Sequence, residues 1–412
     1  RDSGGSPRAS NPPHRPPAAR TLRVSPVCRY FDSGRPSPIA TCNCILIPLS
    51  LLLSPGHLII VINLQKNTIN NYNVNFVITY LLLFSIYLLL RNLFQGANSH
   101  GQLGLNEISE QVNTPTKITR DFWCKTKQVA CGGGHTLLLD DEGKLFACGW
   151  NIKKQLGLED NAQGFERVWS LSGINFINIA CGWDFSCGVT NDKYLFVWGS
   201  NSHGQLGLPK EQFSDAVKPV RLHVNACSVS MGLRHTAIIN SKGEVWTTGC
   251  GKHGQLGLGT TTLISDRFQK VPLKSMVTHL ACGQNHTLAW SSDEKALYVW
   301  GDNKHGQLLL TTEKYKKIYK PEKIDIDVKQ KVNKLLCGWT NALMWLEDGE
   351  LLAWGRNNYG QLGTVETFED KIIHIKLPGM LYILGIRTLT NSITQEKNCI
   401  FVSNNKTQQI FH

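Results

Sequence analysis

One ten-residue segment recurs six times along the chain and constrains the fold more than any other feature. It reads GSNSHGQLGL at 199–208, and its other copies read GANSHGQLGL, GWNIKKQLGL, GCGKHGQLGL, GDNKHGQLLL and GRNNYGQLGT. The first glycines of the six copies are Gly96, Gly149, Gly199, Gly249, Gly301 and Gly355. Consecutive copies begin 50 to 54 residues apart, a period typical of repeat proteins in which each unit buries its apolar face only against its neighbours. The sequence therefore predicts an array of small, similar units.

A glycine-rich segment of this kind can also bind phosphate, and the copy GCGKHG at 249–254 matches the spacing G-x-G-x-x-G. A dinucleotide site would need a strand before the loop, a long helix after it and an acidic residue about 20 positions later. The sibling copies argue against that context, because a binding loop usually occurs once whereas a structural device recurs. We therefore interpret the segment as a structural turn and expect no cofactor.

Each period also contains a predicted β-hairpin. Residues 174–199 read INFINIACGWDFSCGVTNDKYLFVWG. The alternation in INFINIAC predicts one strand, FSCGVT a second, and YLFVWG a third after the turn Asn191-Asp192-Lys193. With a short strand near GQLGL, each unit becomes an antiparallel sheet of about four strands. Such sheets pack radially as the blades of a β-propeller, which hides the edges that isolated sheets would expose. The predicted fold class is all-β.

In a propeller the recurring segment is the junction between blades. Its glycines, and the asparagine of G-x-N, are expected to adopt the positive φ of a tight turn. The turn glycines are Gly101, Gly204, Gly254, Gly306 and Gly360, and Lys154 takes this position in the second copy. The leucine of GQLG is expected to pack between blades, at Leu103, Leu156, Leu206, Leu256, Leu308 and Leu362.

Three segments of different composition define the predicted domain organisation. Residues 1–43 are rich in Arg, Pro and Ser and are expected to be disordered. Residues 44–95 are largely hydrophobic, and residues 96–412 contain the propeller repeats, five complete and a sixth partial.

Two interpretations of the hydrophobic segment 44–95 remain open. Its apolar runs at 44–64 and 75–90 are long enough to suggest a membrane anchor. The alternative, which we favour, is translated non-coding sequence, because no methionine precedes Met231 and the residues just before Gly96 match the codons that end a typical intron.

The net charge of +12 is concentrated before the repeats, since residues 1–95 carry +7 and residues 96–412 carry +5. No Lys/Arg cluster in the repeats resembles a nucleic-acid patch, so we expect no nucleic-acid partner. Four of the thirteen cysteines share one repeat position, which indicates packing residues of a protein in a reducing compartment. These four are Cys131, Cys181, Cys282 and Cys337.

The pattern G-x-N-x-x-G-Q-L-G, followed about 30 residues later by A-C-G-x-x-H-T and then by W-G, resembles the repeat of the regulator of chromosome condensation family. The six copies carry this resemblance over residues 96–412. The blocks ACGWDF at 180–185, GLRHT at 232–236 and DNKHGQL at 302–308 are similar to the branch of exchange factors that regulate secretion.

The resemblance implies a propeller of seven blades, closed by strands from both chain ends. This chain departs from that pattern, because TQEKNCIFV at 394–402 stands where C-G-x-x-H would be expected and no W-G follows. We therefore expect about six blades, an incompletely closed ring and a fragment of the full propeller.

Two sets of histidines recur at fixed repeat positions. One set is His135, His235 and His286, and the other is His100, His203, His253 and His305. Equivalent positions in successive blades lie around a ring, so they do not converge on one ion as tetrahedral ligands must. We expect structural hydrogen bonds within each blade, and neither a metal site nor catalytic residues.

Positions at which a copy departs from the repeat pattern are the candidates for a partner-binding surface. They are Trp183, Asp184, Phe185, Arg234, Trp339, Thr340 and Asn341. We expect them in loops on one face of the ring, where propellers bind partners. The alternative is that the aromatic side chains fill a wide gap between blades.

The resemblance implies a protein partner that is a small GTPase, with guanine nucleotide exchange as the activity. No residue is independently assigned to nucleotide release. Two alternatives stay open, a scaffold without exchange activity and a membrane-anchored propeller that uses residues 44–90. We expect a cytoplasmic monomer, with a nuclear location as an alternative and a membrane location if the apolar runs are genuine.

Overall fold

The computed structural model describes residues 93–118, 126–358, 361–362, 371–375, 393–395 and 400–402. Regular structure in these residues is almost entirely β, with one short 3₁₀ helix, η1 (Trp169–Leu171). None of their helices is long and apolar enough to cross a membrane. The predicted segment 1–43 and both apolar runs, at 44–64 and 75–90, lie outside the described residues.

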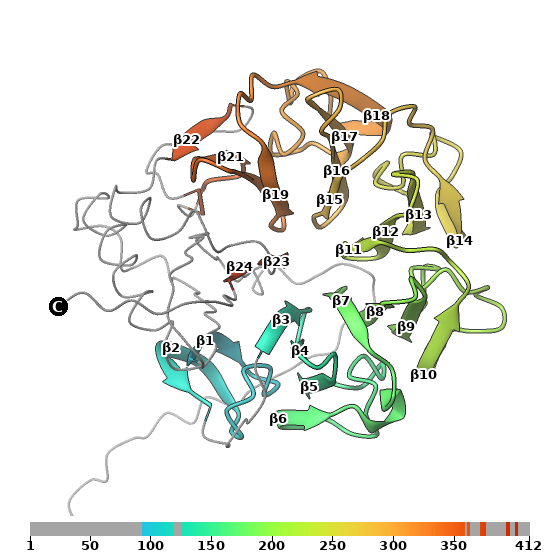
Figure 1. Ribbon diagram of the computed structural model, residues 1–412, viewed down its shortest axis with the longest axis vertical. Coiled ribbons are helices and arrows are strands. Elements are labelled where there is room, and N and C mark those ends of the chain that lie inside the picture. The colour runs from blue at the N-terminus through green and yellow to red at the C-terminus, as the bar shows by residue number, and fades with distance from the viewer. Residues whose placement is uncertain are drawn as a thin grey trace, which may run out of the picture. The chain divides into compact units, whose positions relative to one another are not determined.

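Five antiparallel sheets of four strands each form the body of the fold (Figure 1). The first contains β3 (Thr126–Cys131), β4 (His135–Asp140), β5 (Leu145–Gly149) and β6 (Ala162–Arg167). The second contains β7 (Phe176–Cys181), β8 (Phe185–Thr190), β9 (Leu195–Ser200) and β10 (Asp215–Leu222). The third contains β11 (Ser228–Met231), β12 (His235–Ile239), β13 (Val245–Cys250) and β14 (Ile264–Lys270). The fourth contains β15 (His279–Cys282), β16 (His286–Ser291), β17 (Ala296–Asp302) and β18 (Lys317–Asp325). The fifth contains β19 (Val332–Cys337), β20 (Asn341–Leu346), β21 (Leu351–Gly355) and β22 (Ile373–Ile375).

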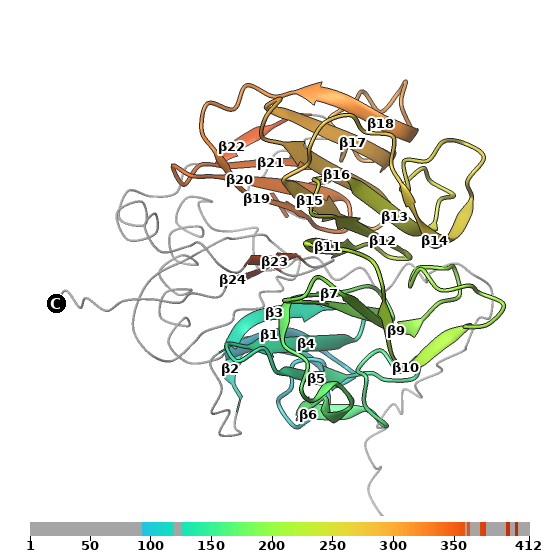
Figure 2. The same ribbon diagram turned by 45° about the vertical axis from the view of Figure 1, so that its right-hand side comes forward.

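These sheets are the blades of a propeller. The strand order in each sheet follows the chain, and the innermost strands β3, β7, β11, β15 and β19 contact one another in sequence around a common centre. The turned view in Figure 2 shows β15 to β18 side by side from that centre to the rim. The predicted all-β propeller is thereby confirmed.

Two short sheets lie between the first and fifth blades. One pairs β1 (Leu93–Asn98) with β2 (Ser109–Lys117), and the other pairs β23 (Ile393–Gln395) with β24 (Ile400–Val402). Strand β23 contacts both β3 and β19, so it continues the circle of innermost strands. No pairing joins the two short sheets within the described residues. The described residues thus form five four-stranded blades and a sixth position occupied by strands from both ends of the described region, close to the expected count.

The recurring segment forms the predicted turns. The turn glycine Gly204 has φ 73°, and Lys154 adopts the same conformation at φ 61°. Gly199, at φ 97°, also lies so close to β8 that an added Cβ would come within 2.7 Å of the Cα of Phe185. Gly360 lies outside the described residues.

The motif asparagine has a different role from the one predicted, because none of these asparagines has a positive φ. Asn201 instead caps the loop with its side chain. Its Nδ2 donates to the carbonyl oxygens of Leu208 and Phe213 at 2.9 and 2.7 Å, and its Oδ1 accepts from the Leu206 amide at 3.0 Å. The asparagine therefore satisfies buried backbone groups.

Contacts between neighbouring blades repeat around the ring. The motif leucines are all buried, as predicted, and Leu206 is fully inaccessible. The buried indole of Trp198 donates from Nε1 to the carbonyl oxygen of Gln155 in the preceding copy at 2.8 Å. Trp300 and Trp354 repeat this bond to Gln255 and Gln307. These three motif copies are therefore each bonded to the next blade along the chain.

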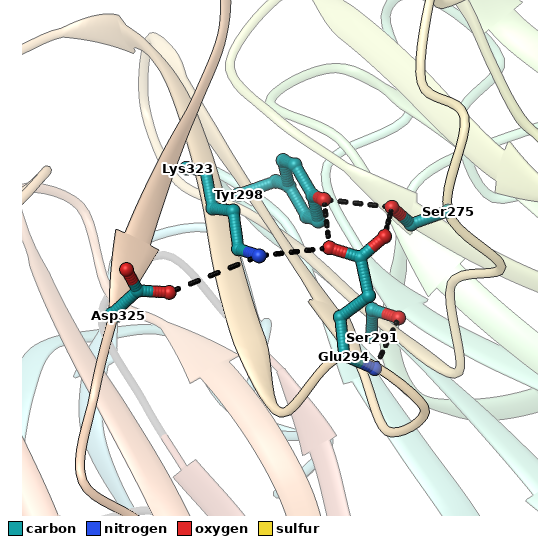
Figure 3. Close-up of polar contacts among 6 residues, drawn as sticks. All are labelled: Ser275, Ser291, Glu294, Tyr298, Lys323 and Asp325. Carbon is teal, nitrogen blue, oxygen red and sulfur yellow. Dashed lines mark hydrogen bonds and ion pairs between the residues drawn. The ribbon is translucent and has the colours of Figure 1, made fainter.

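A polar network stabilises the hairpin turn of the fourth blade (Figure 3). Glu294 follows β16 and accepts hydrogen bonds from the Ser275 and Tyr298 hydroxyls, the latter at 2.7 Å. The Lys323 ammonium of β18 lies 3.0 Å from the same carboxylate. These contacts, led by the Ser275 hydrogen bond, lower the pKa of Glu294 to about 2.

Candidate partner-binding face

The predicted site residues lie at one end of the blades. Because adjacent strands are antiparallel, the loop after the first strand of a blade and the turn after its third strand meet at the same end. The Cys250 amide, for example, donates to the Arg234 carbonyl oxygen at 2.8 Å. We call this end the loop face. It contains the first-strand loops 132–134, 182–184, 232–234, 283–285 and 338–340, and the turns 99–101, 151–154, 201–204, 251–254 and 303–306.

Backbone hydrogen bonds join the first-strand loops to one another. The Gly133 amide donates to the Trp183 carbonyl oxygen at 2.8 Å. The Leu233 amide donates to Gln284, and the Gln284 amide to Trp339, at 3.0 and 2.9 Å. These bonds join the loops of the first and second blades and, separately, those of the third, fourth and fifth blades, so all five blades contribute a loop to the face.

Trp183 and Trp339 contact each other in this surface. Their rings are 5.3 Å apart between centroids and inclined by 77°, an edge-to-face arrangement that aromatic pairs favour. They come from the second and fifth blades, which are not neighbours in the ring. Gly133 lies flat against the Trp183 indole, because an added Cβ would approach its Cδ2 to 2.6 Å. Both tryptophans are half-buried and therefore remain partly accessible from the loop face.

Three of the predicted residues are inaccessible. Phe185, Thr340 and Asn341 are buried, with at most 8% of their surface exposed. Phe185 and Asn341 begin β8 and β20, where other repeats place their buried histidine. We therefore assign no surface role to these three side chains.

The buried histidines bridge neighbouring blades, which corrects the prediction of bonds within each blade. His135 Nε2 lies 2.9 Å from Ser186 Oγ, and His235 Nε2 lies 3.0 Å from Thr287 Oγ1. The Ser186 hydroxyl itself donates to the Gln155 carbonyl oxygen at 2.7 Å, so the imidazole is the donor to the hydroxyl. A structural role in hydrogen bonding thus explains these histidines. Among the described residues no group of three His, Cys, Asp or Glu side chains is placed to hold a metal ion.

Arg234 and His203 form a polar pair on the loop face. Arg234 Nη1 donates to His203 Nε2 at 2.8 Å, and His203 Nδ1 therefore carries the proton and donates to Ser202 Oγ at 2.8 Å. Burial, and then the positive charges of Arg234, Lys252 and Lys210, lower the pKa of His203 to about 4. The imidazole is neutral at pH 7, so it can accept the arginine hydrogen bond.

Two further residues, which the sequence analysis did not predict, extend the loop face. Trp150 packs beside His100 with 4.9 Å between ring centroids, and its amide donates to Gly134 at 2.8 Å. Ile152 is 58% exposed on the adjacent turn. Both depart from the repeat pattern, which has small or polar residues at these positions, so the same criterion could have found them.

Comparison with known proteins places these features in a family. Residues 92–407 match the model of the RCC1-like domain. The chain is 37% identical over 295 residues to the secretion-regulating guanine nucleotide exchange factor of Bos taurus, covering 66% of this chain and 61% of that protein. It is 32% identical over 282 residues to the ultraviolet-B receptor UVR8 of Arabidopsis thaliana, covering 66% and 62%. The chain thus matches less than two thirds of the length of these curated relatives.

Solved structures support the fold. Human WBSCR16 is similar with a TM-score of 0.63 and 21% identity, over 76% of this chain and 81% of that one. Yeast RCC1 (Prp20), solved bound to Kap60, gives a TM-score of 0.63 at 19% identity, over 76% and 88%. At these identities the likeness concerns the architecture alone.

Proposed function

The chain belongs to the RCC1-like domain family, and from this premise we propose that it binds a small GTPase through the loop face and promotes release of its guanine nucleotide. The proposal that the loop face binds a GTPase rests on the contact between Trp183 and Trp339, in a surface to which all five blades contribute. Half-buried tryptophans are frequent hot spots of protein interfaces. The exchange part rests on the likeness to the secretion-regulating exchange factors of cattle and mouse, and we extend their named role in secretion to this chain.

Exchange of this kind needs no covalent chemistry. A protein that binds the nucleotide-free GTPase more tightly than the nucleotide-bound form shifts the population toward the empty state. The loop face has to supply only that difference in affinity. The compartment that fits this role is the cytoplasm.

A nucleotide-release assay tests both parts. A panel of small GTPases loaded with fluorescent GDP is mixed with the full chain and with the variants Trp183→Ala and Trp339→Ala. We expect accelerated release from at least one GTPase, and a loss of about tenfold or more in each variant, as for a hot-spot tryptophan.

Trp169→Ala is the matched control. Trp169 is 67% exposed, and its connection from β6 to β7 runs beside the hairpin turn of the first blade, since the Val168 amide bonds to Leu145 and the Phe176 amide to Gly143. It therefore lies at the end of the blades opposite the loop face. Release at the spontaneous rate across the whole panel contradicts the exchange activity. Binding to a GTPase without release favours the alternative, a scaffold propeller.

A further inference from the structure

Arg234, Lys210 and Lys252 place three positive charges beside His203. In the part that the structure describes, Arg234, Lys210 and Lys252 form no ion pair with a carboxylate. Two acidic residues near these lysines have other contacts. Asp266 accepts the backbone amide of Lys210 at 3.3 Å, and Asp302 lies 4.0 Å from His253.

The guanidinium of Arg234 is held by a neutral base instead. His203 accepts one of its five N–H donors at 2.8 Å, and the Ser202 hydroxyl fixes the other side of that imidazole. The Arg234 side chain is half-buried, so its position is set before any partner arrives. A fixed guanidinium with unused donors matches the geometry of a carboxylate, which it binds with two parallel hydrogen bonds.

Backbone hydrogen bonds link the loop of Arg234 to the loop of Trp339. Leu233, next to Arg234, bonds through the backbone to Gln284, which bonds in turn to Trp339. Protein interfaces commonly combine an aromatic anchor with a charged group at its side. The arginine therefore belongs to the same surface as the tryptophans and is open to the same partner.

We propose that Arg234, flanked by Lys210 and Lys252, is the docking point for a carboxylate from an acidic segment of the protein partner. This inference rests on the proposed function only in assigning the carboxylate to the partner bound at the loop face. It names the chemistry that the partner must present there: an Asp or Glu side chain close to an apolar residue that contacts the tryptophans.

A short acidic peptide tests the charge requirement without knowledge of the partner. Fluorescein-labelled hexaglutamate is titrated with the full chain, and binding is followed by fluorescence anisotropy, with hexaglutamine as the neutral comparison. We expect hexaglutamate to bind and hexaglutamine not to bind. Arg234→Gln should weaken binding about tenfold, and Arg234→Lys should restore part of it, because a lysine keeps the charge but loses the planar fork.

Arg221→Gln is the matched control and should change binding by less than about twofold, because it removes the same charge from the other end of the blade, where salt screens it from the peptide. Arg221 stacks on Tyr194 at 4.0 Å beside the hairpin turn, at the end of the blade away from the loop face. Equal losses in Arg221→Gln and Arg234→Gln would mean that hexaglutamate responds only to overall charge, which overturns the proposal. Equally tight competition by inorganic phosphate overturns the assignment to an acidic peptide.

His203 provides a direct readout at the site. A carboxylate beside Arg234 offsets the positive charges that lower the pKa of His203, so the pKa should rise when hexaglutamate binds. The pKa is measured by NMR on histidine-labelled chain, with the resonance assigned from His203→Gln. An unchanged pKa at saturating peptide contradicts docking at Arg234. Peptide binding with no exchange on any GTPase would contradict the proposed activity and leave the charge site standing.

Discussion

Single residues decide how well neighbouring blades are joined. His135 and His235 each reach a hydroxyl of the next blade, on Ser186 and Thr287. His286 has the same position, but the equivalent residue of the next blade is Ala342, and neither nitrogen of His286 has a hydrogen-bond partner among the described residues. Burial lowers the pKa of His286 to about 3, so the ring is neutral. A buried imidazole without a hydrogen-bond partner lowers the free energy of unfolding of the chain.

Replacing Ala342 by serine should repair this position. The new hydroxyl would accept from His286 and donate to the Gln307 carbonyl oxygen, as Ser186 does in its blade. We expect Ala342→Ser to raise the free energy of unfolding by about 1 kcal/mol, measured by urea denaturation. Ala289→Ser, a substitution in the same core, is expected to lower it by about 1–3 kcal/mol. Destabilisation by both variants to the same extent would refute the missing-partner explanation.

At the scale of elements, the hairpins are the part of the fold most fully encoded in local sequence. The strands ending in W-G and their turns follow from residue alternation and turn chemistry. At the hairpin turn of the fourth blade, Glu294 adds contacts to Ser275, Tyr298 and Lys323 that join the hairpin to its neighbours (Figure 3).

This hairpin should respond to acid. The folded-state pKa of Glu294, about 2, lies below its ordinary value of 4.5. The network therefore contributes stability above pH 4.5 that is lost as the pH falls from about 4.5 toward 2. We expect Glu294→Gln to unfold with less dependence on pH in this window, measured by urea denaturation at a series of pH values. A pH dependence identical to that of the unaltered chain would show that Glu294 does not contribute.

The limits of prediction from sequence also appear at this scale. The buried leucines and turn glycines follow from the repeat alone. The capping role of Asn201 does not, because a positive φ and a side-chain cap both favour asparagine. The Trp183–Trp339 contact joins residues 156 positions apart in blades that are not adjacent, and no periodic pattern specifies such a pair. The burial of Phe185 and Asn341 likewise depends on the space between blades.

At the scale of the whole molecule, stability should be carried mostly by contacts between successive blades. Innermost strands contact their neighbours in turn, and the side-chain bonds between blades join each blade to the next. Repeat proteins of this kind behave approximately as sums of unit and nearest-neighbour terms.

Double-mutant cycles test this additivity. We expect His135→Ala and Ser186→Ala, in adjacent blades, to show a coupling energy of about 0.5–3 kcal/mol. His135→Ala and Thr287→Ala, in blades further apart, should be additive within about 0.5 kcal/mol. The measurement is the free energy of unfolding of the four chains in each cycle. Comparable coupling in both cycles would indicate cooperativity across the whole ring.

The hydrogen bonds between one first-strand loop and the next at the loop face use backbone amides and carbonyl oxygens. Every residue other than proline offers both groups, so the joints do not depend on which side chains the loops carry. Positions 183, 234 and 339 can therefore change identity without loss of these backbone bonds. Under the proposed function, the backbone holds the surface and the side chains at these positions select the partner, so substitution at a few of them changes the binding preference while the ring is kept.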